Sequence, residues 1–382
     1  MSIYPIYLDY NATTPCDPQV LETMLPFFSA HFGNAASKGH SHGWFAEDAV
    51  AQAREQVADL IGADSSEIIF TSGATESINL AIRGMAEKHA AKGRHIITVS
   101  TEHKAVLDVC EYLQSSGFDI TTLPVNQFGM IELAQLHASI QKDTILIAAM
   151  YANNETGLIH PVAAIGDIAK QNGIPFFCDA TQAVGKLPID VIRDGIDMMA
   201  FSAHKMYGPK GVGALYVRKK NPKIDIAPLF YGGGHERKLR SGTLNVPGIV
   251  GLGKAAEVCQ TMMESEATRL RELRDFFWQE LRDIQGVEWN GQKDQSLSHV
   301  ANICFDIAGG DKLIKMISKH VSVSSGSACS SASIEPSHVL KAMGLSETKA
   351  HSSIRFSLGR FTTIQEVEKT IDAVKSAVTR LI

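Results

Sequence analysis

A glycine turn, an aspartate and a lysine each follow a strand-like run, where backbone and side-chain groups can bind a ligand. Ser72, Gly73, Ala74 and Thr75 come after the apolar run EIIF (67–70) and open a helix-like segment. Backbone N–H groups at a helix N-terminus, together with the helix dipole, suit a phosphate group. Taken alone, an ordinary strand-to-helix turn with Thr75 as its cap is the commoner explanation.

Asp179 ends the apolar run that begins at IPFFC, and Gln182 follows one turn later. Ligands of α/β proteins bind at the carboxyl ends of parallel strands, so this carboxylate could keep a pyridinium nitrogen protonated. Pyridoxal phosphate (PLP) needs such a partner when it acts as an electron sink. A helix N-cap accounts for Asp179 equally well when the residue is taken alone.

Lys205 ends the run DMMAFSAHK (197–205), which also contains Ser202 and His204, and the glycine-rich YGPKGVG follows. A lysine that ends a buried strand is costly unless it is used or neutralised, and a Schiff base with an aldehyde cofactor does both. Taken alone, a lysine reaching into water from a strand edge is the simpler explanation. The phosphate turn, the acid and the lysine occur together, however, and with His103 in TEHKAV as a ring-stacking candidate they predict a PLP site.

Two further residues could act on an amino-acid substrate. Cys329 lies in SSGSACSSAS, where small neighbours predict an exposed, mobile loop (about 322–333) whose thiolate could act as a nucleophile. A chance surface cysteine is the alternative. Arg355, in the strand-like SSIRFSL, has the fork geometry that binds a carboxylate through two hydrogen bonds. A structural salt bridge is the commoner role of such an arginine.

The elements that would position these residues alternate along the chain. Short apolar runs at 67–70, 95–99, 144–150, 174–180 and 197–205 alternate with helical patterns, which predicts an α/β fold with a mostly parallel sheet and helices on both faces. After Pro247 the order becomes a long helix (248–285), strands at 301–307 and 352–358, and a terminal helix (363–381). We therefore expect a large domain at 16–254, and a smaller α+β domain formed by 1–15 and 255–382.

Composition limits the classes of function. The 382 residues carry a net charge of -5, which argues against direct nucleic-acid binding, and no apolar run is long enough to cross a membrane. The six cysteines form no CxxC pair, which argues against a zinc site, and they are too sparse for a disulfide framework. The N-terminus has no secretory signal pattern, so a reducing, cytoplasmic location is expected.

The longer motifs resemble one family over essentially the whole chain. YLDYNATTP, FTSGATES, TEHKAVL, NNETG, DATQAVGKLPID, FSAHKMYGPKGVGALY, GGGHERKLRSGT, SSGSACSSAS and SSIRFSLGRFT are similar to the cysteine desulfurases of the IscS/NifS type, within the fold-type I PLP enzymes. The SSGSAC segment resembles that of the members with a long catalytic loop.

The resemblance implies a role for each matching position. Lys205 would bind PLP covalently, Asp179 would pair with its ring nitrogen, Gln182 with its ring oxygen, and His103 would stack on the ring and help move protons. The phosphate would be bound by Ala74, Thr75, Ser202 and His204, and by Thr243 from the partner subunit of a homodimer. Asn154 and Arg355 would hold the carboxylate of L-cysteine.

The same resemblance implies the reaction and its alternatives. Cys329 would take the substrate sulfur as a persulfide, release L-alanine and pass the sulfur to an acceptor protein in iron–sulfur cluster assembly, tRNA thiolation or DNA phosphorothioation. Because the chain ends at Ile382, soon after the last predicted helix, it would lack the longer tail with which many relatives dock a scaffold. Selenocysteine lysis, another PLP lyase or transaminase reaction, and a non-catalytic sulfur-relay platform remain the alternatives.

Overall fold

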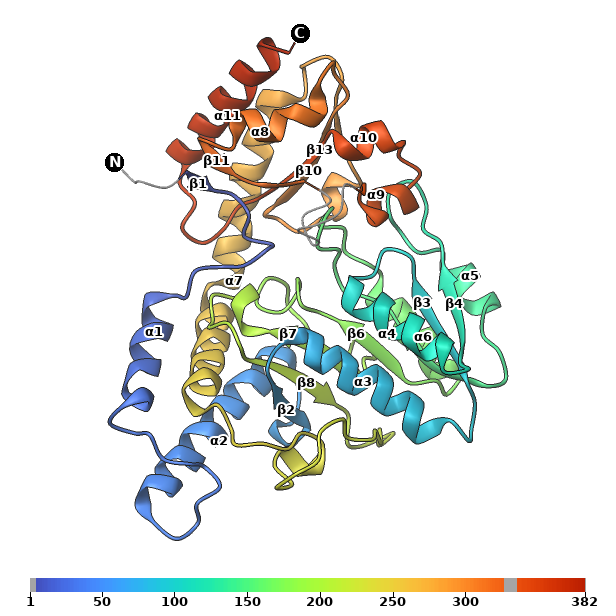
Figure 1. Ribbon diagram of the computed structural model, residues 1–382, viewed down its shortest axis with the longest axis vertical. Coiled ribbons are helices and arrows are strands. Elements are labelled where there is room, and N and C mark those ends of the chain that lie inside the picture. The colour runs from blue at the N-terminus through green and yellow to red at the C-terminus, as the bar shows by residue number, and fades with distance from the viewer. Residues whose placement is uncertain (1–4, 326–334, 382) are drawn as a thin grey trace.

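The computed structural model describes residues 5–325 and 335–381, and within these ranges the strands form sheets of seven, four and two strands (Figure 1). The seven-stranded sheet has the order β2 (Ile68–Thr71), β8 (Gly213–Val217), β7 (Met198–Ser202), β6 (Phe176–Asp179), β5 (Thr144–Ala148), β3 (His95–Val99) and β4 (Asp119–Leu123). All its pairings are parallel except those of β8, which runs against both neighbours. The predicted α/β fold with a mostly parallel sheet is confirmed.

Helices cover both faces of this sheet because its strands are apolar on both sides. In β6, Phe176 and Cys178 join the core on one face, while Phe177 joins the core on the other. The first core is closed by α2 (Ser41–Ile61), α6 (Val162–Gln171) and the start of α7 (Val246–Leu281). The second is closed by α3 (Ala74–His89) and α4 (Lys104–Ser115). The carboxyl ends of the parallel strands therefore share one open edge.

A second core is built on the four-stranded antiparallel sheet, in the upper half of Figure 1. Its order is β12 (Ser324–Ser325), β13 (Ser353–Ser357), β10 (Val300–Phe305) and β9 (Val287–Trp289). Helices α8 (Leu313–Ile317) and α11 (Ile364–Thr379) pack against it, and β1 (Ile6–Tyr7) pairs with β11 (Val321–Ser322) beside it. The remaining helices are α1 (Pro18–Met24), α5 (Leu133–Ala138), α9 (His338–Ala342) and α10 (Glu347–His351).

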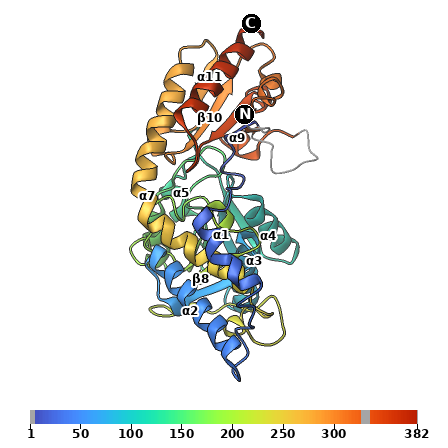
Figure 2. The same cartoon turned by 90° about the vertical axis from the view of Figure 1, so that its left-hand side faces the viewer.

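One long helix connects the two parts, as Figure 2 shows from the side. The first part of α7, as far as Cys259, is buried in the core of the seven-stranded sheet, and from Leu270 onward it is buried in the core of the four-stranded sheet. The predicted domain boundary at 254/255 falls inside this unbroken helix and stays a prediction. No helix in the described ranges is long and apolar enough to span a membrane.

Some predicted elements were wrong in detail. The run 197–205 ends as a strand at Ser202, and Lys205 follows in a short 3-10 helix, η3 (Ala203–Lys205). The glycine-rich segment after it leads directly into β8, which the sequence analysis did not predict. Because so short a connection cannot cross over the sheet, β8 has to run antiparallel to β7. Strand β4 was also missed, because its residues DITTL are mostly polar and partly exposed.

Candidate functional site

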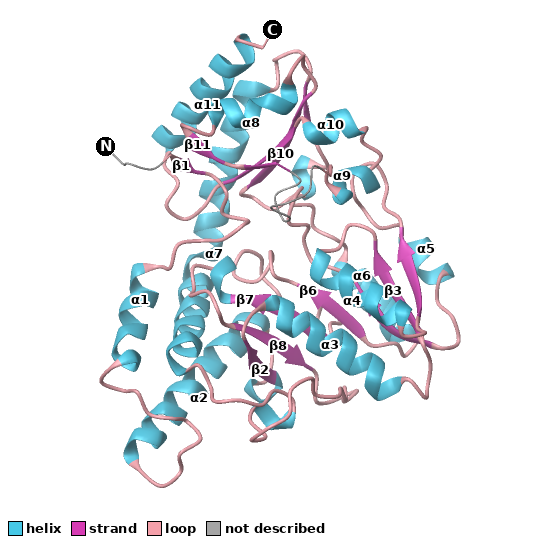
Figure 3. Cartoon of the chain, in the orientation of Figure 1, coloured by secondary structure: helices cyan, strands magenta, loops and turns pink. Residues whose placement is uncertain are grey.

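A cavity of about 760 Å³ is lined both by residues at the carboxyl edge of the seven-stranded sheet and by residues of the four-stranded sheet. Figure 3 shows the strands of the two sheets in magenta, one group above the other. The predicted residues that line it are Ala74, Thr75, His103, Asn154, Asp179, Gln182, Ser202, His204, Lys205 and Arg355. Thr243 is exposed and is not among the lining residues. Cys329 lies outside the described residues. The structure thus gathers nearly all of the predicted side chains around one space.

Lys205 reaches the N-terminal segment of the chain. Its Nζ donates to the backbone carbonyl of Asn11 and, at 2.7 Å, to that of Ala12. The adjacent His204 is within 3.1 Å of the Thr13 hydroxyl through Nδ1. Burial, and then the nearby Lys205, lower the pKa of His204 to about 4, so its imidazole is neutral at physiological pH. The lysine amine and a neutral imidazole therefore face the same end of the cavity.

Asp179 ends β6 and offers one free-facing oxygen. Its Oδ1 accepts from the backbone N–H of Thr181 at 3.0 Å and from the Thr181 hydroxyl, so Oδ2 is the oxygen that can accept from a ligand. This turn replaces the helix N-cap considered from the sequence. Nearby Glu102 is fully buried, and burial followed by the charge of Asp179 raises the pKa of Glu102 well above its ordinary value. Burial therefore favours the neutral form of Glu102.

Gln182 is oriented by hydrogen bonds at both ends of its amide. Its Oε1 accepts from Lys186 Nζ at 3.0 Å, and its Nε2 donates to the Asn11 carbonyl at 3.0 Å. The Asn11 carbonyl also accepts from Lys205, while the Asn11 side chain accepts from His299 Nε2 at 2.9 Å. Asn11 therefore connects the lysine, the glutamine and the four-stranded sheet.

The turn before α3 has the shape of an anion site. Gly73 caps the helix with φ 154° and ψ -178°, a conformation that L side chains rarely adopt, so the alternative with Thr75 as cap is wrong. A Cβ added to Gly213 would lie 2.5 Å from the Phe201 carbonyl and 2.7 Å from the Gly73 Cα. Two glycines thus let β8 approach the turn closely, while the first N–H groups of α3 have no partner within the helix.

His103 caps α4: its Nδ1 accepts from the backbone N–H of Ala105 at 3.1 Å. This histidine therefore has a structural role as a helix cap, and it also lines the cavity. Since Nδ1 is used as an acceptor, Nε2 is the nitrogen that can exchange a proton with a ligand.

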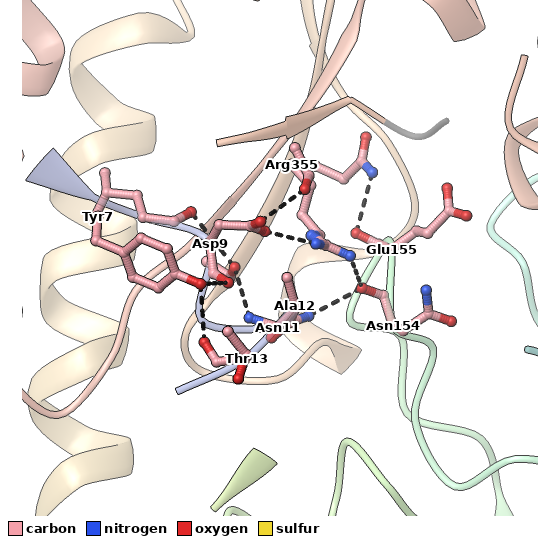
Figure 4. A network of polar contacts seen from close by, with 12 residues as sticks. Tyr7, Asp9, Asn11, Ala12, Thr13, Asn154, Glu155 and Arg355 are labelled. Atoms are coloured by element: carbon pink, nitrogen blue, oxygen red, sulfur yellow. Dashed lines mark hydrogen bonds and ion pairs between the residues drawn. The ribbon is translucent and has the colours of Figure 1, made fainter. Parts of the chain in front are cut away.

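Arg355 lies on β13 and lines the cavity on the side of the four-stranded sheet. Figure 4 shows its contacts. Its guanidinium donates to the Asp9 carboxylate at 2.7 Å and to the backbone carbonyl of Asn154 at 2.8 Å. The salt bridge weighed as the alternative for this arginine is present, and it lies at the cavity wall rather than away from it. The arginine contacts the backbone carbonyl of Asn154 and not the Asn154 side chain.

A family model described as aminotransferase class-V matches residues 6–370. The cysteine desulfurase IscS of Klebsiella pneumoniae is 53% identical over 379 residues, which are 99% of this chain and 93% of that protein. This chain belongs to the cysteine desulfurases of the class-V aminotransferase family.

Two solved structures show the same desulfurase fold. A NifS-like protein superposes with a TM-score of 0.91, with 37% identity, 99% of this chain and 100% of that chain covered. A structure described as SspA in complex with cysteine gives a TM-score of 0.83, with 40% identity and coverage of 94% and 100%. The resemblance drawn from the motifs is confirmed.

Sequence reasoning assigned no role to several residues that line the cavity of this desulfurase: Asp9, Asn11, Thr13, Glu76, Thr181, Lys210 and Ser324. The first three lie in YLDYNATTP, which was recognised only as part of the resemblance. A polar DYNATT segment after a short apolar run is a usable signal for a site. Spacing in the sequence, however, cannot connect Asn11 with a lysine at position 205.

Proposed function

We propose that this desulfurase takes sulfur from L-cysteine onto Cys329 and releases L-alanine, with PLP as its cofactor. The observation that carries the proposal is one cavity lined by Lys205, Asp179 and Arg355 together with the N-terminus of α3. An amine, an acid, a carboxylate-binding cation and an anion site are the four groups that a PLP enzyme acting on an amino acid requires.

The residues present fit this cofactor. The volume of about 760 Å³ is in the usual range for small-molecule sites. The Gly73 turn and the α3 N-terminus suit the phosphate, with Thr75, Ser202 and His204 beside them. The free-facing Oδ2 of Asp179 suits a protonated ring nitrogen, which the neutral state of nearby Glu102 does not oppose. When bound, PLP supplies a carbonyl that links to amines and an electron-withdrawing ring that stabilises negative charge at the substrate Cα.

Each of the predicted side chains has a separate role in the proposed reaction. Lys205 Nζ would be the amine to which the cofactor links, and as a free amine it would be the base that takes the substrate Cα proton. Gln182 would bind the ring oxygen, and His103 would lie against the ring and carry protons through Nε2. Arg355 and Asn154 hold the substrate carboxylate. The Cys329 thiolate attacks the substrate sulfur, forming an S–S bond as the Cβ–S bond breaks.

The test is the release of sulfide and L-alanine from L-cysteine in the presence of a reductant, for the wild type and single variants. We expect Cys329→Ala to bind PLP and lose sulfide release, and Lys205→Ala to lose both the cofactor absorbance and the activity. Cys16→Ala, a free and partly exposed cysteine outside the cavity lining, is the matched control and should stay active. Equal activity in wild type and Cys329→Ala would falsify the persulfide step and favour a lyase.

We also propose a homodimer, in which Thr243 contributes to the partner's phosphate site. Support comes from exposed apolar side chains that follow α1 and begin α2: Phe28, Phe32, Trp44 and Phe45 are 62%, 68%, 52% and 48% exposed. Large aromatic side chains exposed together mark interaction surfaces. Thr243 is itself exposed, as a residue that acts on a neighbour has to be.

The homodimer is tested by measuring the molar mass of the protein by light scattering as it elutes from a size-exclusion column. Phe32→Asp should shift the mass toward a monomer, because it places a charge in the apolar patch. Phe128→Asp, at an exposed phenylalanine outside that patch, should leave the mass unchanged. A wild-type protein that elutes as a monomer at all concentrations would overturn the proposal.

Selenocysteine lysis is the second candidate reaction, since Lys205 and Asp179 would serve it equally. The relative described in complex with cysteine favours the sulfur substrate. A non-catalytic relay platform has no need of the lysine, the acid and the clamp together. The persulfide is proposed to pass to an acceptor protein in the cytoplasm, where reducing conditions keep thiols such as the five described cysteines free.

A further inference from the structure

We propose that Asp9 is the positioning residue for Arg355, so that the substrate carboxylate is bound by an arginine already fixed by an aspartate. The inference rests on the proposed function, because it takes Arg355 as the carboxylate clamp. It adds a residue to which no role has been given above, on a segment at the opposite end of the chain from the arginine.

Arg355 donates hydrogen bonds to two protein groups and still has N–H groups available for a ligand. The residue is 5% exposed and lines the cavity. One amino group donates to Asp9 Oδ1 at 2.7 Å and the other donates to the Asn154 carbonyl at 2.8 Å. A guanidinium has five N–H groups, so these contacts leave donors for a further acceptor. Its buried Nε has no hydrogen-bond partner among the described residues. The arginine is therefore fixed in place and still able to bind an anion.

Asp9 is itself fixed independently of the arginine. Its Oδ2 accepts from the Ser324 hydroxyl at 2.9 Å, and its backbone forms a parallel bridge with Ser357 of β13. The Tyr7 hydroxyl donates to the Asp9 carbonyl, and Tyr7 lies within 3.0 Å of the Thr13 carbonyl too, which closes the turn (Figure 4). A carboxylate anchored at both its side chain and its backbone can impose an orientation on a long, flexible arginine.

A second buried pair provides the comparison. Asp17 and Arg360 also lie 2.7 Å apart, with side chains 6% and 5% exposed, but neither lines the cavity. Loss of Asp9 would leave the buried Arg355 without its carboxylate partner among the described residues, whereas loss of Asp17 would leave Arg360 paired with Glu266. Only the Asp9–Arg355 pair has a face toward the cavity, so only its loss should act selectively on ligands that carry a carboxylate.

The experiment measures ligand binding to the PLP-loaded protein through the change in cofactor absorbance. L-Alanine carries the amine and the carboxylate, and ethylamine carries the amine alone. We expect Asp9→Ala to weaken L-alanine binding about tenfold or more, the effect of losing one hydrogen bond to a charged group, with ethylamine within about twofold. Asp9→Asn keeps an acceptor oxygen in place and should recover most of the L-alanine affinity.

Asp17→Asn is the matched control and should change neither affinity. Its melting temperature is compared with that of Asp9→Asn to separate an effect on folding from one on binding. If Asp9→Ala does not fold, Asp9→Ser, which is too short to reach the arginine, carries the same test. An equal loss for both ligands, or no loss for either, overturns the role of Asp9. A wild type that binds L-alanine no better than ethylamine overturns the Arg355 clamp, and with it both proposals.

Discussion

Lys205 and Arg355, two cations at the cavity, each lie beside oxygen atoms that accept their hydrogen bonds. Lys205 donates to two backbone carbonyls, and Arg355 lies against Asp9. Glu102 and Asp179 are two acids close enough to influence each other, and burial keeps Glu102 protonated. The negative charge at the end of β6 is thus concentrated on one residue. A single fixed charge of this kind is what a cationic ring nitrogen requires.

The two acids should therefore respond differently to amide substitution. Glu102→Gln replaces a protonated acid by a neutral group of the same shape that still accepts from the Met150 N–H, so sulfide release should stay within about threefold of wild type. Asp179→Asn removes a charge and should lower it about 100-fold or more. Both are measured at pH 8 with saturating PLP. Comparable losses in the two variants would show that Glu102 is ionised after all.

At the scale of elements, α9 is hydrogen-bonded to a buried acid that follows β5 of the seven-stranded sheet. Ser337 caps α9 by accepting from the Leu340 N–H at 3.2 Å, and its hydroxyl donates to Glu155. Glu155 follows β5 in NNETG and is 6% exposed, and burial raises its pKa from 4.5 to about 7. The helix is therefore joined to a carboxyl group that prefers to be neutral when the protein is folded.

The burial of Glu155 makes stability depend on pH. Between about pH 4.5 and pH 7 the folded state keeps a proton on Glu155 that the unfolded state has lost, so the free energy of unfolding falls as pH rises. The decrease from this group should reach on the order of 3 kcal/mol by pH 8. Denaturant unfolding at pH 5 and pH 8 should show it in wild type and not in Glu155→Gln. An unchanged difference in the variant would assign the effect to other groups.

The elements that sequence predicted best are those with one clear physical signal. β3 and β6 are apolar on both faces, and the runs at 95–99 and 174–180 predicted them. Strand β4 is polar, and β8 follows glycines that also predict a turn, so both were missed. The cavity residues on strand ends were found because each has a reactive side chain. Asp9 and Asn11 were not, because their importance comes from contacts with distant segments.

At the scale of the whole molecule, the cavity depends on how two cores are held together. Asp179 ends a strand of the seven-stranded sheet, and Lys205 and the N-terminus of α3 follow other strands of the same sheet. Arg355 lies on a strand of the four-stranded sheet. Helix α7 is shared by both, and its middle, around Ser265, is exposed between the two buried stretches. The cofactor side and the substrate side of the cavity are therefore aligned by a continuous helix.

A break in α7 should consequently affect substrate more than cofactor. Ser265→Pro removes a helical hydrogen bond and clashes with the preceding turn. PLP affinity should change less than about threefold, while the KM for L-cysteine rises about tenfold or more, since a small misalignment of a clamp is costly. Ser265→Ala, which keeps the helix, should behave as wild type. Parallel losses of cofactor and substrate affinity would contradict this division of labour.

The pairing of Asp9 with Arg355 joins residues that are 346 positions apart. Strand β1 likewise pairs with β11, which comes near the other end of the chain. On the ribosome, the segments that carry Asp179 and Lys205 leave the exit tunnel long before Arg355 has been translated. Domains generally fold as their residues emerge, so a nascent chain can complete the cofactor side first. The substrate side closes only when almost the entire polypeptide has been made. Under the role proposed for Arg355, incomplete translation products that lack β13 therefore also lack the carboxylate clamp.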